Sequence, residues 1–207
     1  MLAYIKGELA QKQIGYVVID VGGLGYKVYM SEPSIDEIGN IGEQVKVHTY
    51  YKVAEDDISI FGFNTSEELR MFELLISVSG IGAKTATAML GCIEPSQFAI
   101  AVISNDIDTL KRIPGVGPKS AQRIVLELKD KMKKEQQISE LSNATSEQKS
   151  KVHKIIVSDS KVQEATDALQ VLGYTRKDVE KVLEKIDTQD LTIEDIIKIS
   201  LRELSMR

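Results

Sequence analysis

The feature of this chain that most restricts its fold is a Gly-x-Gly turn between two helical patterns, found twice and 35 positions apart. The first copy contains residues 80–85 (GIGAKT) and the second contains residues 115–120 (GVGPKS). An apolar run with helical periodicity precedes each copy, and each copy has a lysine at the same offset. Glycine permits a tight reversal and lets another backbone approach closely. At Gly82 and Gly117 a Cβ is expected either to obstruct the approach of a phosphate or to demand a strained backbone. Each copy is therefore predicted to be two helices joined by a sharp turn.

The start of the second helix in each copy is predicted to bind a phosphate group. Its N–H groups have no partner within the helix and point outward, and the nearby lysine adds a mobile positive charge. Such a unit contacts the nucleic-acid backbone and reads no base, which is typical of binding without sequence preference. This pattern resembles the helix-hairpin-helix motif. The predicted DNA-phosphate contacts are Gly80, Gly82, Lys84, Thr85, Gly115, Gly117, Lys119, Ser120 and Arg123.

Two nucleotide-binding motifs compete for the same residues. A phosphate loop needs glycine immediately before the lysine, where Ala83 and Pro118 stand. A dinucleotide-binding fingerprint needs a third Gly or Ala where Thr85 and Ser120 stand, and it needs a strand before the first glycine. A third alternative is that the hairpins only pack and bind nothing. That alternative explains the glycines but not the paired lysines.

The distribution of charge favours nucleic-acid binding more than the net charge of −5 does. Residues 110–134 contain eight basic side chains and only two acidic ones. Positive charge is therefore concentrated around the second hairpin. The lysines of residues 129–134 are given no role, because a run of charge on a helix is more often a solvated face.

The composition indicates a folded protein of a reducing compartment. With 207 residues, of which 43% are hydrophobic, the chain can form one large domain or two to three small ones. Cys92 is the single cysteine, so no intramolecular disulfide can form, and its apolar neighbours predict a buried thiol. The N-terminus lacks a secretory pattern, and no apolar run reaches membrane-spanning length. A cytoplasmic protein with no membrane partner is expected.

Residues 1–63 show the two-residue period of β-strands. Runs such as residues 16–21 (YVVIDV) and 45–50 (VKVHTY) alternate with glycine-containing turns. Five or six short strands of this kind predict a small β-barrel, and an oligonucleotide-binding (OB) fold is the best match. Thr65 and Glu68 then form a capping-box pattern that predicts the first helix of the next region.

The remainder of the chain is predicted to be helical, in two parts. Residues 64–135 form an all-α domain with the tandem hairpins. Residues 136–157 are polar and contain no aromatic side chain, so a flexible linker is expected. Residues 158–207 carry capping patterns that begin at Ser160, Thr175 and Thr192, and Gly173 is expected to end a helix. These signals predict a small three-helix domain. The expected fold class is therefore α+β multidomain: an OB-fold-like barrel, a tandem helix-hairpin-helix domain and a C-terminal three-helix domain.

The C-terminal domain is expected to bind another protein. A domain of this size has a marginal core, so some apolar side chains should remain exposed. An exposed apolar patch on a tethered domain usually marks a protein partner. Leu169, Leu172 and Ile197 are the residues expected near this contact.

Residues for metal or nucleophilic chemistry are sparse. His48 and His153 have no Cys or His at the spacing of metal ligands, and no Gly-x-Ser-x-Gly motif occurs. No metal, cofactor or catalytic residue is therefore predicted. The acidic run Glu55-Asp56-Asp57 leaves two alternatives open, a solvated turn or a Mg²⁺ site of a nuclease.

The order of barrel, tandem hairpins, polar linker and three-helix unit resembles the RuvA family, the DNA-binding subunits of bacterial Holliday junction branch-migration complexes. The resemblance spans essentially the whole chain and includes residues 1–7 (MLAYIKG) and the Gly62-Phe63 pair that closes the barrel. It implies roles in DNA recombination, DNA repair and the SOS response to DNA damage. It also implies an acidic pin at Glu55 and Asp56, and it leaves the role of the additional Asp57 open.

The same resemblance implies an assembly. A homotetramer would hold a four-way junction open, and one tetramer or two, an octamer, would bind each junction. The C-terminal domain would recruit the ATP-hydrolysing motor RuvB, and the resolvase RuvC would be a further partner. The chain itself would have no catalytic site.

Two other functions compete with a junction-binding scaffold. Base-excision enzymes with helix-hairpin-helix motifs place a catalytic Asp shortly after the hairpin, whereas here no acidic residue follows Gly117 before Glu127. The chain could also be a general DNA-binding module of a repair enzyme. Competition between junction and duplex DNA distinguishes that module from a scaffold.

Overall fold

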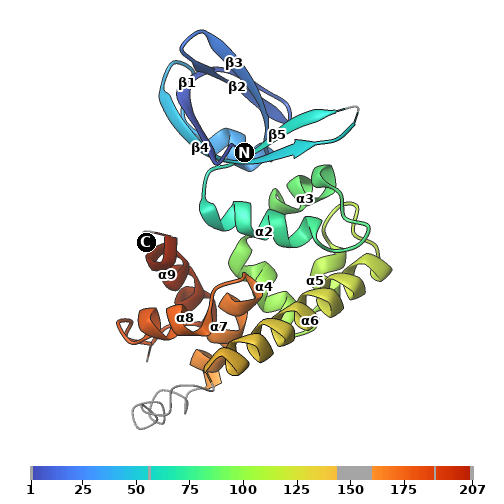
Figure 1. Cartoon of the computed structure of the whole chain (residues 1–207), viewed down its shortest axis with the longest axis vertical. Helices are drawn as coiled ribbons and strands as arrows, with labels where there is room; N and C mark the ends of the chain where they lie inside the picture. The colour runs from blue at the N-terminus through green and yellow to red at the C-terminus, as the bar shows by residue number, and fades with distance from the viewer. Residues whose placement is uncertain (1, 56, 144–159, 189, 206–207) are drawn as a thin grey trace. The chain divides into compact units, whose positions relative to one another are not determined.

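The computed structural model describes residues 2–55, 57–143, 160–188 and 190–205 (Figure 1). The chain forms two compact units, Met1–Glu94 and Pro95–Arg207. The boundary lies between the two hairpins, inside the region 64–135 that the sequence predicts to be one helical domain. The first hairpin therefore belongs to the same unit as the barrel, and the second belongs to the same unit as the C-terminal helices.

The first unit contains a closed barrel of five strands in the order β1-β2-β3-β5-β4. The strands are β1 Tyr4–Gln13, β2 Tyr16–Val21, β3 Leu24–Tyr29, β4 Gln44–Val53 and β5 Ile58–Phe63. Neighbouring strands are antiparallel except β3 and β5, which are parallel. Leu9, Val17 and Val47 point into the barrel and are fully buried. The predicted small barrel is confirmed.

Close packing at the end of β5 depends on a glycine. A side chain at Gly62 would place its Cβ 2.4 Å from a methyl carbon of Val28. No other residue fits there without displacing the Val28 side chain of β3. The Gly62-Phe63 pair noted in the sequence therefore has a steric cause within the barrel.

One barrel element was not predicted. Helix α1, Glu32–Glu37, lies between β3 and β4. Its local signals are an N-cap at Ser31, whose hydroxyl accepts the Ser34 N–H at 3.3 Å, and Pro33 in the first turn. The strand-like alternation before and after this segment concealed a helix of fewer than two turns.

Helices α2 (Ser66–Ile76) and α3 (Ala83–Leu90) complete the first unit. Helix α2 begins as predicted, because the Thr65 hydroxyl accepts the Glu68 N–H at 3.2 Å. The Glu68 carboxylate in turn accepts the Asn64 N–H at 2.9 Å. This reciprocal capping satisfies two backbone donors at the helix start.

An aromatic cluster fixes α2 against the barrel. The ring of Phe72, on α2, lies 5.1 Å from that of Tyr50, 5.5 Å from Phe61 and 4.8 Å from Phe63. Rings at these separations interact favourably beyond the area they bury. Phe61, Phe63 and Phe72 are buried, so the cluster forms a core outside the barrel. It determines where the first hairpin lies on β4 and β5.

The second unit begins with the helices that build the second hairpin. These are α4 Pro95–Ile103, α5 Ile107–Lys111 and α6 Pro118–Asn143. Phe98, Leu110 and Ile124 are fully buried among them. Between α4 and α5, Asn105 adopts a φ of 56°, and Asp106 caps α5 by accepting the Thr109 N–H at 3.0 Å.

Helix α6 extends further than predicted. It continues to Asn143, whereas a flexible linker was expected from residue 136. Lys, Glu and Gln, which favour helices, make up more than half of residues 133–143, and extending an existing helix avoids the cost of starting one. The beginning of the predicted linker is therefore wrong. Its remainder, residues 144–157, lies outside the described residues.

The C-terminal helices are α7 Ser160–Val171, α8 Arg176–Leu183 and α9 Ile193–Ser205. Thr175 and Thr192 cap α8 and α9 as predicted, each accepting a backbone N–H three residues later. Gly173 ends α7 with a φ of 81°, and the Tyr174 N–H bonds to the Leu169 carbonyl at 3.1 Å. The predicted helix stop is confirmed.

The prediction that Leu169, Leu172 and Ile197 remain exposed is wrong. All three side chains are buried, with at most 1% of their surface accessible. Helix α7 packs against α4 as well as α9, so the C-terminal helices share a core with part of the preceding domain. Composition could not predict this contact because α4 lies far away in the sequence.

Among the described residues, no single helix is long and apolar enough to cross a membrane. Helices α3 and α4 are long and apolar enough only when they are taken together, and the chain bends between them.

Candidate nucleic-acid interface

The two Gly-x-Gly hairpins have the same backbone. Gly80 has a φ of 87° and Gly115 a φ of 83°, which is the left-handed region that favours glycine. Between each pair of glycines a single apolar side chain points inward, and Ile81 and Val116 are only 8% and 6% exposed. Each inward side chain anchors its loop, and the glycines on either side remain at the surface.

The hydrogen bonds of the two loops also correspond. In the first hairpin the Ile81 N–H bonds to the Val78 carbonyl at 3.1 Å. In the second, the Val116 N–H bonds to the Ile113 carbonyl at 3.0 Å. The Ala86 N–H bonds to the carbonyl of the second glycine at 2.9 Å, as does its counterpart in the other copy. The repeat seen in the sequence is therefore a repeat of the structure.

Backbone strain does not explain why glycine occupies positions 82 and 117. Gly82 has a φ of −89°, which any residue can adopt, and Gly117 has no positive φ. An added Cβ at either position would meet nothing within 4 Å. One expectation from the sequence was that these glycines prevent strain, and that expectation is wrong. The space beside both glycines is open, so an external group can approach the backbone there.

The first turn of each following helix presents backbone donors. The N-cap Gly82 has no side chain to bond them, and the first N–H paired within α3 is that of Ala86. Helix α6 begins at Pro118, which has no N–H, and its first paired N–H is that of Ala121. The N–H groups of residues 83–85 and of residues 119–120 form no hydrogen bond with a described residue. Such groups attract an anion.

Positive side chains accompany both sets of donors. Lys84 and Lys119 are exposed, and neither forms an ion pair with a residue that the structure describes. Arg123 lies one turn beyond Lys119 on α6, with its Nε 4.0 Å from a Glu127 carboxylate oxygen. An exposed pair at that distance contributes little, so the guanidinium can still contact a ligand. Thr85 and Ser120 are partly buried beside the lysines.

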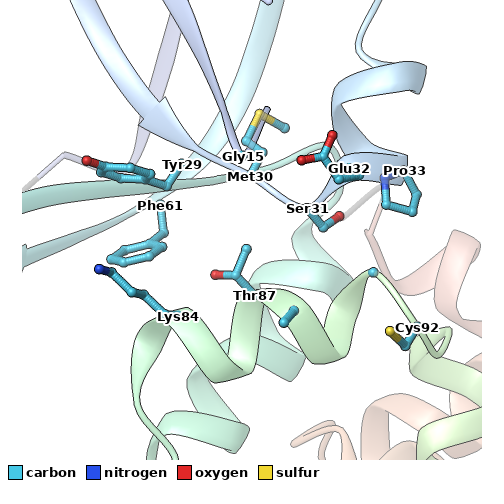
Figure 2. Close-up of a pocket in the computed structure, with 12 residues that line it drawn as sticks. Gly15, Tyr29, Met30, Ser31, Glu32, Pro33, Phe61, Lys84, Thr87 and Cys92 are labelled. Carbon is cyan, nitrogen blue, oxygen red and sulfur yellow. The ribbon is translucent and has the colours of Figure 1, made fainter. Parts of the chain in front are cut away.

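A mainly apolar pocket of about 420 Å³ lies between the barrel and α3, within the first unit. Figure 2 shows Lys84 extending from α3 toward Phe61 and Tyr29, which belong to the barrel wall. The Lys84 stem therefore crosses apolar surface while its ammonium group remains in water. Cys92 lines the same pocket and is exposed, so the prediction of a buried thiol is wrong.

The acidic run lies at the tip between β4 and β5. Glu55 is exposed, as an acidic pin requires, and Asp56 lies outside the described residues. Asp57 accepts a hydrogen bond from the Ser59 hydroxyl at 2.7 Å, so its carboxylate is held back over β5. Within the described ranges, no three His, Cys, Asp or Glu side chains are grouped to hold a metal ion.

The helices that lead into the two hairpins carry acidic caps with opposite pKa shifts. Burial raises the pKa of Glu68, outweighing the hydrogen bonds from Asn64 and Thr65. Hydrogen bonds from Thr109 lower the pKa of Asp106, which is fully exposed. The first cap thus favours the protonated acid and the second favours the carboxylate.

Three segments match known family descriptions. Residues 1–62 match the RuvA N terminal domain, residues 72–130 the SAM-like helix-hairpin-helix tandem, and residues 160–205 the RuvA C-terminal domain. A curated relative from Acetivibrio thermocellus is 47% identical over 205 residues, which is 99% of each chain. The chain belongs to the RuvA family.

Other relatives match over the same length. One from Ruminiclostridium cellulolyticum is 39% identical, covering 99% of this chain and 100% of the relative. One from Natranaerobius thermophilus is 35% identical and covers both chains completely. Each of the three is called Holliday junction branch migration complex subunit RuvA. The matches to the RuvA N-terminal and C-terminal domains flank the helix-hairpin-helix match, in the order that the sequence predicts.

The residues that position the first hairpin were not predicted from the sequence. The aromatic cluster around Phe72 holds α2 on the barrel, but it was not predicted. A usable signal existed, because Tyr50 lies on the outer face of β4, and Phe61 and Phe63 lie on the same face of β5. Three aromatic side chains on one outer face indicate that another element covers it.

Proposed function

We propose that this RuvA-family chain binds four-way (Holliday) junction DNA without sequence specificity and serves as the non-catalytic DNA-binding subunit of a branch-migration complex. The observation that carries the proposal is the pair of hairpins with the same backbone, the same open glycine and the same exposed lysine. The names of the relatives support the choice of a junction as the DNA substrate.

Each hairpin would hold one stretch of DNA backbone. A phosphate approaches the open side of Gly82 or Gly117, where no Cβ obstructs it. Its oxygens then accept hydrogen bonds from N–H groups of the first helical turn, and Lys84 or Lys119 neutralises its charge. The predicted contacts from Gly80, Thr85, Gly115, Ser120 and Arg123 belong to the same two sites. None of these contacts distinguishes one base from another.

We further propose that the chain acts as a homotetramer, so that several hairpin pairs engage the arms of one junction. Glu55 and Asp56 would face the centre, where carboxylates repel phosphates and help keep the arms apart. Asp57, held by Ser59, would contribute less to this repulsion because its carboxylate is directed over β5.

The proposed partners are the motor RuvB and, by resemblance, the resolvase RuvC. Residues 158–207 would recruit and stimulate the motor. The contact would not use Leu169, Leu172 or Ile197, because these side chains form the core. Exposed side chains of α8 and α9 are available instead, and Ile199 on α9 remains 38% exposed.

Competition binding tests the proposal. Purified chain is bound to a labelled four-way junction, and unlabelled junction or linear duplex of the same sequence is added. We expect the junction to compete at a much lower concentration than the duplex, for junctions of unrelated sequence alike. Equal competition by duplex would show a general DNA-binding module instead. Junction cleavage by the purified chain with Mg²⁺ would contradict the non-catalytic assignment.

Recruitment of the motor is better tested in the full chain than by deletion. Removing residues 160–207 would uncover the face of α4 that packs against α7. Substitution of exposed residues leaves that core intact. Ile199→Asp should leave junction binding unchanged and reduce stimulation of the motor ATPase, and unchanged stimulation would exclude this part of α9 from the contact.

A further inference from the structure

A second pocket lies beside Gly82, on the side of α3 that faces the tip of the β4–β5 hairpin. Its volume is about 450 Å³. The pocket is lined by residues 82–85 together with Tyr29, Lys52, Asp57, Ser59 and Phe61. Two elements that are distant in the sequence, strand β4 and the first turn of α3, thus each contribute a lysine to one pocket.

The pleat of the sheet explains why Lys52 faces this pocket. Side chains alternate along a strand, so Lys52 lies on the same face of β4 as Tyr50. Across the sheet, Tyr50 pairs with Phe61 and Lys52 pairs with Ser59. Tyr50 and Phe61 both contact Phe72 of α2, which fixes this face against the first hairpin. Lys52 is the next residue along the face and is therefore held beside α3 by a rigid strand.

The charges in the pocket favour an anion. Lys52 and Lys84 are both exposed, and neither has a hydrogen bond or an ion pair with a residue that the structure describes. Asp57 is the acidic side chain of the lining, and its carboxylate already accepts a hydrogen bond from Ser59. The lining therefore carries a net positive charge, to which the N–H groups of the first turn of α3 add. Two ammonium groups in one pocket repel each other unless an anion lies between them.

We propose that Lys52 is a further DNA-binding residue of the first hairpin and holds, together with Lys84, one backbone phosphate between β4 and α3. This inference rests on the proposed function, since it adds a residue to the same phosphate site. The barrel then takes a direct part in DNA binding as well as positioning the hairpin. The second hairpin obtains its additional cation differently, from Arg123 on its own helix.

Equilibrium binding of the full chain to a labelled four-way junction, measured over a series of salt concentrations, tests the proposal. The variants are Lys52→Gln, Lys84→Gln and the double variant. Lys46→Gln is the matched control, because Lys46 lies on the same face of β4, about 20 Å along the strand from Lys52. It removes the same charge from the same strand at a distance from the pocket.

We expect Lys52→Gln to weaken binding about three- to tenfold at low salt and to reduce the salt dependence of affinity. Lys46→Gln should change junction affinity and its salt dependence much less. The double variant should lose less than the product of the two single losses, because both lysines contact one phosphate. Thermal stability should not change, since Lys52 is exposed.

Three results are separable. If Lys52→Gln behaves like Lys46→Gln while Lys84→Gln weakens binding, the inference is wrong and the proposed function stands. Losses that multiply in the double variant would show two separate phosphates and contradict the shared pocket. If Lys84→Gln has no effect either, the proposed phosphate site at the first hairpin is wrong.

Discussion

The two hairpins share a backbone but differ in what surrounds them. Gly80 and Gly115 have nearly equal φ angles, and the corresponding hydrogen bonds agree within a few tenths of an ångström. The first hairpin lies against β4 and β5 through Phe72, within the unit that contains the barrel. The second leads into the long helix α6, in the unit that contains the C-terminal helices.

This difference separates what the motif provides from what its context provides. The loop, the open glycine and the lysine occur in both copies, so each hairpin should hold a phosphate in the same way. The context adds a different second cation to each, Lys52 from the barrel and Arg123 from α6. The same local device can therefore serve two stretches of backbone in different surroundings.

Charge reversal at both hairpins should have the largest effect on DNA binding. Lys84→Glu combined with Lys119→Glu replaces attraction by repulsion at both phosphate sites, and we expect at least about a hundredfold loss of junction affinity. The loss should be the same for junctions of different sequence, because no base contact is removed. The single variants, measured by the same titration, test whether the two hairpins contribute equally.

Equal losses from Lys84→Glu and Lys119→Glu would support the structural repeat as a functional repeat. A loss confined to one variant would show that only one hairpin contacts DNA.

Substitution of the open glycines should have the next largest effect. Gly82→Val and Gly117→Val place a side chain where a phosphate approaches, and the extended backbone at Gly82 accepts valine without strain. We expect each variant to lose about tenfold or more in affinity and to keep its helical circular dichroism and melting temperature. Gly80→Ala is the contrasting control, because its positive φ should cost about 1 kcal/mol of stability.

Normal junction binding by Gly117→Val would show that no phosphate passes the second hairpin. A large fall in melting temperature in both valine variants would instead show that these glycines are needed for folding.

Neutralising the acidic tip should strengthen binding by a smaller factor. Glu55→Gln with Asp56→Asn removes two negative charges from the proposed junction centre, and we expect affinity to rise severalfold, for duplex as well as junction DNA. Asp57→Asn should change affinity less, because Ser59 holds that carboxylate over β5. A decrease in affinity, or the loss of a Mg²⁺-dependent cleavage activity, would contradict repulsion as the role of the tip.

The smallest predicted effect is a pH dependence of opposite sign at the two hairpins. Because burial raises the pKa of Glu68 in the folded chain, its contribution to stability is present at low pH and is lost as pH rises through the raised pKa. The pKa of Asp106 is lowered, so its contribution is present above its ordinary range and is lost as pH falls.

Melting temperatures of Glu68→Gln and Asp106→Asn, measured against pH and compared with the parent chain, test these signs. For Glu68→Gln, the melting temperature of the variant minus that of the parent should rise with pH over the acidic range. For Asp106→Asn, the same difference should fall. If both differences changed with pH in the same direction, Glu68 and Asp106 would not differ in burial, and the account of the two caps would be wrong.

The features that could be predicted from sequence are those that local interactions determine. The hairpins were predicted because glycine positions, apolar spacing and capping residues lie within a dozen residues of one another. The barrel followed from alternation and turn glycines in the same way. Thr65 and Thr192 were recognised as caps for the same reason, since a cap and its helix are adjacent in sequence.

The features that could not be predicted depend on packing between distant segments. Leu169 and Ile197 were expected at the surface, but α4 contributes to the core that buries α7. Lys52 received no role because its place beside Lys84 follows only from the contact of Phe72 with the barrel. Gly82 was assigned to the phosphate site for two reasons, and one of them, backbone strain, was wrong.

The salt dependence of junction affinity tests most directly whether the two hairpins hold the DNA backbone. Dissociation constants for a four-way junction are measured over a series of salt concentrations, with several junction sequences. If four subunits each engage about two phosphates, the plot of log K against log salt should have a slope of about −7, equal for all sequences. A slope near zero, or a strong preference for one sequence, would contradict the account.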